Sequence, residues 1–118
     1  MSKTILVVDD SLVSRMMIKA IIEPHVDDVN IIEAGSGQQA LDSVNPDMEV
    51  DIAFIDYNMP GMTGLELISE LATRMTIPKI ALLTANIQNE IREQAIAAGV
   101  TFLNKPINEE AITGFLNN

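Results

Sequence analysis

The 118-residue chain contains no cysteine and few basic residues. Without cysteine it can form neither a disulfide framework nor a thiolate zinc site. The seven Lys and Arg residues are outnumbered by 17 Asp and Glu residues, which gives a net charge of −10. Such a charge repels phosphates, so it argues against nucleic acid as a partner of this domain. It is compatible with a basic partner surface or with a bound cation.

Long apolar runs are also missing, because no stretch approaches the length that a membrane span requires. The apolar run at residues 5–8 is too short for a signal-peptide core and ends in two aspartates, which indicates a buried strand. Apolar residues make up 47% of the chain and charged residues 20%, as in globular proteins. We therefore expect one domain over residues 1–118, located in the cytoplasm and not at a membrane.

Short apolar runs alternate five times with patterns of helical spacing. Strands are predicted at residues 4–8, 30–33, 50–55, 80–83 and 101–103. Helices are predicted from Ser11 to Pro24, at 38–44, 63–74 and 89–98, and from Asn108 onward. This alternation indicates a parallel sheet with helices on both faces, which right-handed crossovers turn into a doubly wound α/β domain.

Local signals mark several helix ends. Thr63 and Glu66 have the spacing of a capping box, and Asn108 is a suitable N-cap for the last helix. Gly99 is suited to a left-handed cap after the fourth helix. Within the first helix, the apolar spacing predicts that Met16 and Met17 face the core.

Polar residues follow the predicted strands at the places where a doubly wound sheet binds its ligands. Asp9 and Asp10 follow the first strand and Asp56 ends the third, while Thr84 ends the fourth and Lys105 follows the fifth. Three carboxylates in one crevice repel one another, so either one of them is protonated or a cation is present. A hard divalent ion with oxygen ligands, such as Mg²⁺, would remove the conflict.

The same residues suit phosphoryl transfer. A metal ion, the Lys105 ammonium and the Thr84 hydroxyl together can stabilise the charge on a transferring phosphoryl group. Asp56 is then the candidate nucleophile, which would form an acyl phosphate. Each feature alone has an ordinary explanation, since aspartates and threonines often cap helices and Lys-Pro often precedes one. It is their joint occurrence at the ends of successive strands that favours a phosphoryl-transfer site.

The sequence resembles the receiver domains of two-component signalling from Thr4 to about Leu116. The resemblance implies a flavodoxin-like, five-stranded parallel sheet of order 2-1-3-4-5 with five helices. It also implies a phosphoacceptor switch that catalyses only its own phosphorylation and dephosphorylation. The segments that carry it are Ile-Leu-Val-Val-Asp-Asp at 5–10, Asp-Tyr-Asn-Met-Pro-Gly-Met-Thr-Gly at 56–64, Leu-Thr-Ala at 83–85 and Gly-Val-Thr-Phe-Leu-Asn-Lys-Pro at 99–106.

The resemblance also implies the roles of the acidic residues. Asp56 would accept a phosphoryl group from a sensor histidine kinase or a histidine phosphotransfer protein. Mg²⁺, or Mn²⁺ in its place, would bind to Asp10, to Asp56 and to the main-chain carbonyl of Asn58. Asp9 would contribute mainly through water.

A second group of residues is implied to bind the phosphoryl group and to switch. Lys105 would pair with the phosphoryl oxygens, and its peptide bond to Pro106 would be cis. Thr84, with Ala85 beside it, would move toward the phosphoryl group, and the ring of Phe102 would occupy the space that Thr84 leaves. The changed surface would consist of the fourth helix, the fifth strand and the fifth helix, and it would bind a downstream protein.

Other functions remain open at this point. A magnesium-dependent phosphatase with an aspartyl nucleophile needs an aspartate two residues after that nucleophile, where this chain has Asn58. A flavodoxin-like cofactor binder would have to place a flavin phosphate among carboxylates that repel it. A receiver that acts only as a scaffold is a further alternative. The N-terminal receiver excised from a larger regulator would have the same sequence features.

Overall fold

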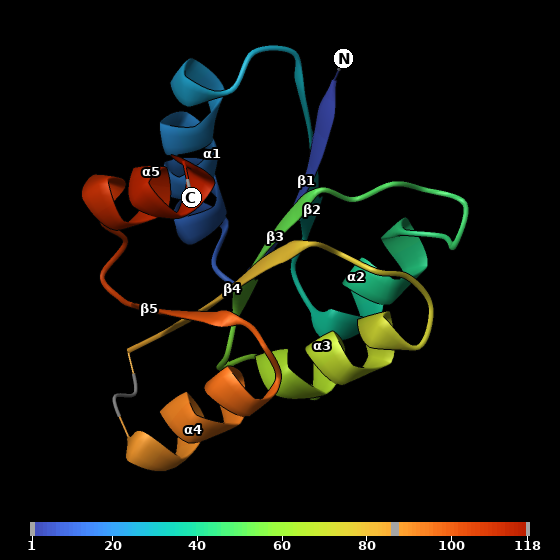
Figure 1. Cartoon of the computed structure of the whole chain (residues 1–118), viewed down its shortest axis with the longest axis vertical. Coiled ribbons are helices and arrows are strands. Elements are labelled where there is room, and N and C mark those ends of the chain that lie inside the picture. Colours follow the sequence, from blue (N-terminus) through green and yellow to red (C-terminus); the bar gives the residue numbers. More distant parts are fainter. Residues whose placement is uncertain (1, 86–87, 118) are drawn as a thin grey trace.

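A computed structural model describes residues 2–85 and 88–117, within which helices and strands alternate along the chain. The strands form one parallel sheet in the order β2-β1-β3-β4-β5 (Figure 1), which confirms the predicted fold class. None of the described helices is both long and apolar enough to cross a membrane. The strands are β1 (Lys3–Val8), β2 (Val29–Ala34), β3 (Ile52–Asp56), β4 (Lys79–Thr84) and β5 (Thr101–Asn104); the helices are α1 (Leu12–His25), α2 (Gly37–Ser43), α3 (Gly64–Ala72), α4 (Asn89–Ala97) and α5 (Glu109–Asn117).

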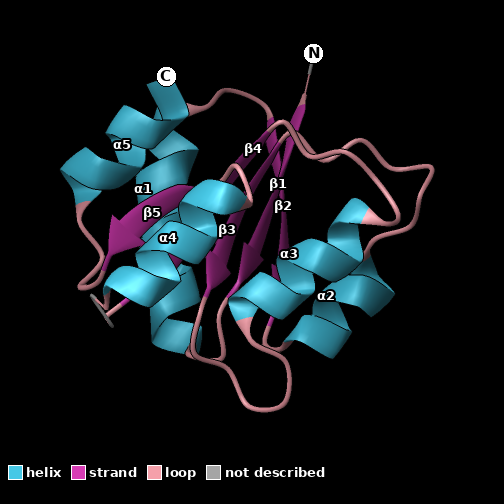
Figure 2. Ribbon diagram, turned by 60° about the horizontal axis from the view of Figure 1, so that its bottom comes forward, coloured by secondary structure: helices cyan, strands magenta, loops and turns pink. Residues whose placement is uncertain are grey.

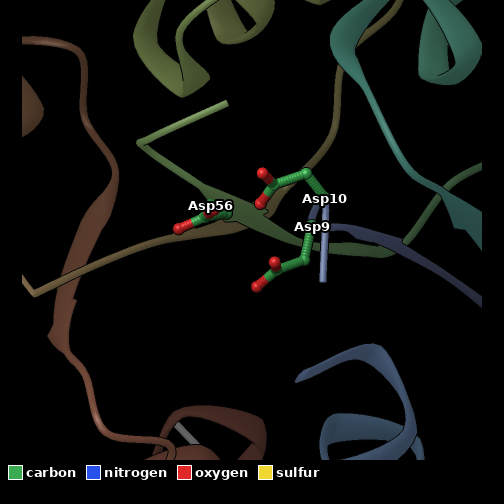
Figure 3. A group of neighbouring side chains, drawn as sticks. All are labelled: Asp9, Asp10 and Asp56. Carbon is green, nitrogen blue, oxygen red and sulfur yellow. The ribbon is translucent and has the colours of Figure 1, made fainter. Parts of the chain in front are cut away.

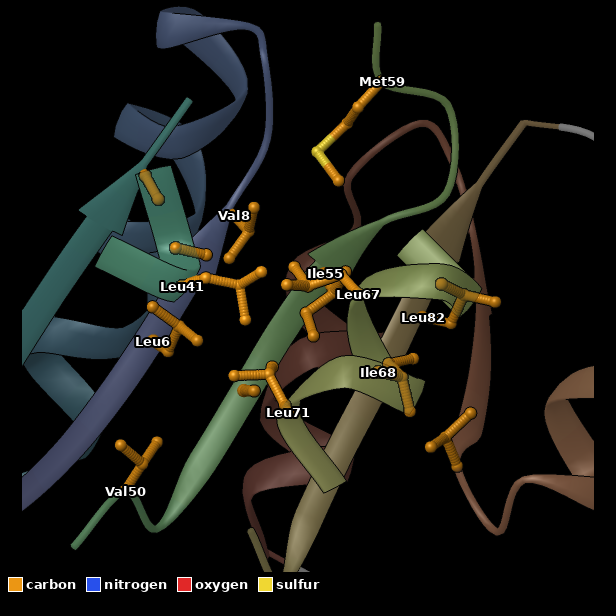
Figure 4. Packing of buried hydrophobic residues seen from close by; sticks show 14 of the residues in the cluster. Leu6, Val8, Leu41, Val50, Ile55, Met59, Leu67, Ile68, Leu71 and Leu82 are labelled. Carbon is orange, nitrogen blue, oxygen red and sulfur yellow. The ribbon is translucent and has the colours of Figure 1, made fainter. Parts of the chain in front are cut away.

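Helices cover both faces of the sheet, with α1 and α5 on one face and α2, α3 and α4 on the other (Figure 2). Side chains of a strand alternate between the two faces, so each central strand contributes to both apolar layers. In β1, Ile5 and Val7 pack toward α1 and α5, whereas Leu6 and Val8 pack toward the opposite helices (Figure 4). β1 and β3 are therefore apolar on both faces, as their continuous apolar runs predicted.

The predicted helix caps are present. The Thr63 side chain accepts a hydrogen bond from the backbone of Glu66, whose carboxylate accepts one from the Thr63 backbone. The Asn108 side chain accepts a hydrogen bond from Ala111 at the start of α5. Gly99 follows α4 with a φ of +76°, the left-handed conformation predicted for it.

The prediction that Met16 and Met17 face the core is wrong. Their exposed fractions are 58% and 45%, whereas Ile18 and Ile22 are 1% and 0% exposed and pack against the sheet. The end of the helix was also misplaced, because Pro24 lies inside its last turn and α1 ends at His25.

Ion pairs to β2 accompany the rotation that α1 adopts. Two apolar stripes coexist in the sequence of this helix, and helical spacing alone does not choose between them. Arg15 and Lys19 lie one turn apart and both pair with Glu33, at 3.1 and 3.0 Å. In the rotation that forms these contacts, Ile18 and Ile22 are buried.

Gly64 allows α3 to begin directly against the end of β3. A Cβ atom at this position would lie 2.8 Å from Cδ1 of Leu82 and closer still to the carbonyl oxygen of Asp56. The latter contact is with backbone, which cannot move away without displacing the end of β3. The glycine is thus required for the close approach of α3 to Asp56.

Gly64→Ala is therefore expected to destabilise the protein by about 1.5 kcal/mol, because the new methyl group overpacks this contact. Gly114→Ala is the matched control, since a Cβ at this position of α5 meets nothing within 4 Å. It should stabilise the protein by about 0.5 kcal/mol through helix propensity. Urea denaturation measures both effects, and equal effects of the two variants would contradict the structural role of Gly64.

Candidate functional site

Three carboxylates meet at the carboxyl edge of the sheet, between β1 and β3 (Figure 3). One oxygen each from Asp9, Asp10 and Asp56 lies within 4.8 Å of the others. The site falls where the chain order of the strands reverses, because β2 lies on one side of β1 and β3 on the other. Asp9 and Asp56 are 1% and 5% exposed, and Asp10 is open to solvent.

Lys105 lies between two of these carboxylates. Its Nζ is 2.9 Å from Oδ2 of Asp9 and 3.1 Å from Oδ1 of Asp56. Side chains alternate between the two faces of the sheet, and this alternation explains why Lys105 meets Asp9 and Asp56. The sheet hydrogen bonding continues one residue past β1 and β5, because the Asp9 N–H donates to Ala34 and the Lys105 N–H donates to Thr84. Asp9, Asp56 and Lys105 thereby share the face of the sheet that α1 and α5 cover.

Burial and repulsion both disfavour the charged form of Asp56. Burial is the larger cause and the neighbouring Asp9 charge the next, and against the opposing effect of Lys105 they raise the pKa of Asp56 to about 6. Burial alone would lower the pKa of Lys105, but its hydrogen bond to Asp9 and the charges of Asp56 and Asp9 raise it above the usual value. Lys105 is therefore a permanent cation, and the site still carries excess negative charge.

The carboxylates differ in how far they are already hydrogen-bonded. Asp9 accepts through Oδ1 from the Ser11 N–H at 2.9 Å and through Oδ2 from Lys105. Asp56 shares Oδ1 with Lys105, and the Asp10 carboxylate has no hydrogen-bond partner among the described residues. Hard oxygen donors with one open side suit a cation such as Mg²⁺ or Mn²⁺. The cluster could thus hold a divalent ion, with Asp10 and Asp56 as the least committed ligands.

The predicted switch residues Thr84 and Phe102 lie on the neighbouring strands β4 and β5. Thr84 is the last residue of β4 and is 1% exposed. Phe102 of β5 is half-buried, pairs in register with Leu82 and packs against the core layer that contains α4. Alternation along β4 and β5 puts Thr84 and Phe102 on the same face of the sheet.

The remaining predicted site residues lie in loops. Asn58 is exposed in the loop between β3 and α3, and Ala85 is exposed directly after β4. The peptide bond between Lys105 and Pro106 is cis. All of these positions border the carboxyl edge of the sheet, where Asp56 lies.

Two residues that contact the site were not singled out from the sequence. Gly64 touches the backbone of Asp56, as described above, and its place in the 56–64 segment was the available signal. Arg15 donates through Nη1 to the main-chain oxygen of Asp9 at 2.6 Å. An arginine in the first helix and an acid, Glu33, in the second strand were visible in the sequence, but nothing linked them to the site.

Comparison with known proteins identifies the class. The family model described as the response regulator receiver domain matches residues 5–117, so the chain belongs to the response regulator receiver family. It is 33% identical over 114 residues to the two-component response regulator ARR15 of Arabidopsis thaliana. The alignment covers 87% of this chain and 55% of that protein. The chain spans still smaller shares, 28% and 31%, of two further curated relatives.

Solved structures agree with this assignment. Chemotaxis protein CheY4 of Vibrio cholerae superposes with a TM-score of 0.84 at 28% identity, over 99% of this chain and 98% of that one. A response regulator from Burkholderia pseudomallei has a TM-score of 0.82 at 25% identity, over 97% and 66% of the two chains. That structure holds a phosphorylated aspartic acid, a calcium ion and citrate.

Proposed function

We propose that Asp56 is the residue at which this receiver accepts a phosphoryl group, from a sensor histidine kinase or a histidine phosphotransfer protein. The observation that carries the proposal is the position of Asp56: buried at the carboxyl end of β3, 3.1 Å from Lys105 and within the three-carboxylate cluster. A carboxylate held beside a fixed cation is a suitable nucleophile for phosphorus. Receivers as a family exchange phosphoryl groups with such partners.

The transfer exchanges one bond to phosphorus for another. An oxygen of Asp56 forms a bond to phosphorus as the bond between phosphorus and the donor imidazole nitrogen breaks, and the imidazole leaves with the bonding electron pair. Lys105, already 3.1 Å from Asp56, pairs with the phosphoryl oxygens that gather charge. Lys105 contacts both carboxylates in the resting protein. During this step it can therefore either keep its contact with Asp9 or give that contact up.

We propose Mg²⁺ or Mn²⁺ as the cation of the site, held by Asp10 and Asp56 with the main-chain carbonyl of Asn58, and by Asp9 through water. When bound, the ion would offset the charge of the carboxylates and of the phosphoryl oxygens. The acidic donor set supports this choice, as does the commitment of both Asp9 oxygens to Ser11 and Lys105.

The proposed output is a change in the surface formed by α4, β5 and α5. Thr84 and Ala85 would shift toward the phosphoryl group, and Phe102, which lies on the same face of the sheet as Thr84, would turn inward. An open groove of about 610 Å³ lined by Phe102, Pro106 and Glu110 supports a binding role for this surface. Ile96 of α4, which is 65% exposed, adds an apolar contact for a downstream protein.

A phosphatase acting on separate substrates is less well supported. Asn58 lies where such an enzyme needs a second acidic group, and an amide cannot transfer the proton. We therefore propose that the chain is a phosphoacceptor switch and that residues 1–118 form one receiver domain. A cytoplasmic location stays a prediction.

Incubation with Mg²⁺ and acetyl phosphate tests the proposed function. The mass of the intact protein should increase by one phosphoryl group, and EDTA should prevent the increase. Asp56→Asn removes the nucleophile and should show no increase. An unchanged mass of the native chain, or an equal gain by Asp56→Asn, would sink the proposal, as would continuous hydrolysis of phosphate esters.

A further inference from the structure

We propose that Arg15 is a positioning residue for the metal ligands, acting through the peptide group that joins Asp9 to Asp10. Its guanidinium donates through Nη1 to the main-chain oxygen of Asp9 at 2.6 Å and through Nε to Oε1 of Glu33 at 3.1 Å. The side chain is only 17% exposed, and its contact with the Asp9 carbonyl is partly buried, whereas its contact with Glu33 is open to water. The inference rests on the proposed metal site.

The backbone around Asp9 shows why such a contact is needed. Its N–H still takes part in the sheet, donating to Ala34 at 3.1 Å, but its carbonyl lies beyond the last residue of β1. Arg15 supplies the donor that the ladder no longer provides. With Ser11 and Lys105 on its two carboxylate oxygens, Asp9 is held at its N–H, its carbonyl and its side chain.

Asp10 depends on this arrangement more than Asp9 does. Its carboxylate is exposed and makes no hydrogen bond to the described residues, so among the contacts of the described residues only those of the backbone restrain its position. The carbonyl that Arg15 holds belongs to the peptide plane that leads into Asp10, and a peptide group is planar. Fixing that oxygen therefore restrains the peptide plane and the position of the Asp10 Cα, from which the carboxylate reaches the cluster.

The surroundings of Arg15 hold the guanidinium in place. Glu33 lies in β2, in register with Val7 of β1, and it also pairs with Lys19 at 3.0 Å. Gly35 lies beside the guanidinium, since a Cβ there would be in ordinary contact with Nη1 at 3.4 Å. The fork of an arginine can contact Glu33 and the Asp9 carbonyl at once, which a single ammonium cannot do in the same geometry.

Electrostatics and positioning predict opposite results when Arg15 is replaced. Loss of a positive charge near three carboxylates should by itself strengthen the binding of a cation. Loss of a group that orients a metal ligand typically weakens metal affinity by 10-fold or more, about the effect expected here. The direction of the change therefore separates the two roles.

The test is calorimetric titration of the full chain with MgCl₂, without a phosphodonor. Arg15→Met should weaken Mg²⁺ affinity about tenfold, and Arg15→Lys, which keeps the charge without the fork, should weaken it by about threefold. Lys19→Met is the matched control: it removes a positive charge and a Glu33 contact but leaves the Asp9 carbonyl bound. It should change the affinity less than twofold.

A second readout keeps the inference testable if Arg15→Met folds poorly. In metal-free Arg15→Lys, the Ser11 amide that donates to Asp9 should exchange with solvent faster than in Lys19→Met. Mg²⁺ binding that is unchanged or stronger in both Arg15 variants overturns the positioning role of Arg15. An equal loss of Mg²⁺ affinity in Lys19→Met overturns it as well. Neither result affects the proposed function. Failure of the native chain to bind Mg²⁺ would instead count against the proposed function.

Discussion

Lys105→Met is expected to destabilise the metal-free protein by about 3 kcal/mol near neutral pH, because it leaves two buried carboxylates without their shared cation. Lys105 Nζ contacts Asp9 at 2.9 Å and Asp56 at 3.1 Å, and both carboxylates are almost fully buried. Methionine keeps most of the aliphatic length and removes the charge. The measured quantity is the free energy of unfolding in urea with EDTA present.

Two conditions should reduce this loss. At about pH 5 the loss should be smaller, because Asp56, whose pKa is raised to about 6, can take up a proton in place of the missing cation. Saturating Mg²⁺ should also restore much of the stability, since the ion binds the folded state. Lys3→Met, at the opposite end of β1, is the charge-matched control and should change stability by less than about 0.5 kcal/mol. A loss that is the same at both pH values and with or without Mg²⁺ would refute this explanation.

Asp56→Asn is expected to stabilise the metal-free protein by about 2 kcal/mol at about pH 7.5. The folded-state pKa of Asp56, about 6, lies above the value of an exposed aspartate. A group with a raised pKa contributes stability below its unfolded pKa and loses it as the pH rises through the folded pKa. Native stability should therefore fall between about pH 4 and pH 6.5 relative to Asp56→Asn, which has no charge to bury.

Urea denaturation of both proteins across this pH range in EDTA measures the difference. The advantage of Asp56→Asn should vanish near pH 4, and Mg²⁺ should reduce it at pH 7.5 by binding the native site more tightly than the variant site. Asp47→Asn, at an exposed position, is the control and should track the native protein. If Asp56→Asn is no more stable than the native chain at pH 7.5, burial and the charge of Asp9 do not destabilise the charged form of Asp56.

Much of the fold and site follows from the order of residue types along the chain. Continuous apolar runs predicted strands buried on both faces, and the rule that parallel strands end at one edge brought Asp9, Asp10, Asp56 and Lys105 together before any contact was known. The structure has them there, with Lys105 bridging two of the aspartates. Cap positions at Thr63 and Gly99 were equally local signals.

The parts that sequence reasoning missed depend on contacts between elements. Helical spacing in α1 fits two stripes, and the structure buries the stripe whose rotation also lets Arg15 and Lys19 pair with Glu33 in β2. The contact of Arg15 with the Asp9 carbonyl depends on the same rotation of the helix. Gly64 has a role because α3 approaches the backbone of Asp56, a distance that no spacing along the chain encodes.

The most direct test of the central claim is to locate the phosphoryl group itself. The chain is incubated with Mg²⁺ and acetyl phosphate and then reduced with borohydride, which converts an aspartyl phosphate to homoserine that peptide mass spectrometry can place in the sequence. Homoserine is expected at Asp56 alone, and none is expected when EDTA replaces Mg²⁺. Homoserine at Asp9 or Asp10, or its formation at Asp56 without a divalent ion, would contradict it.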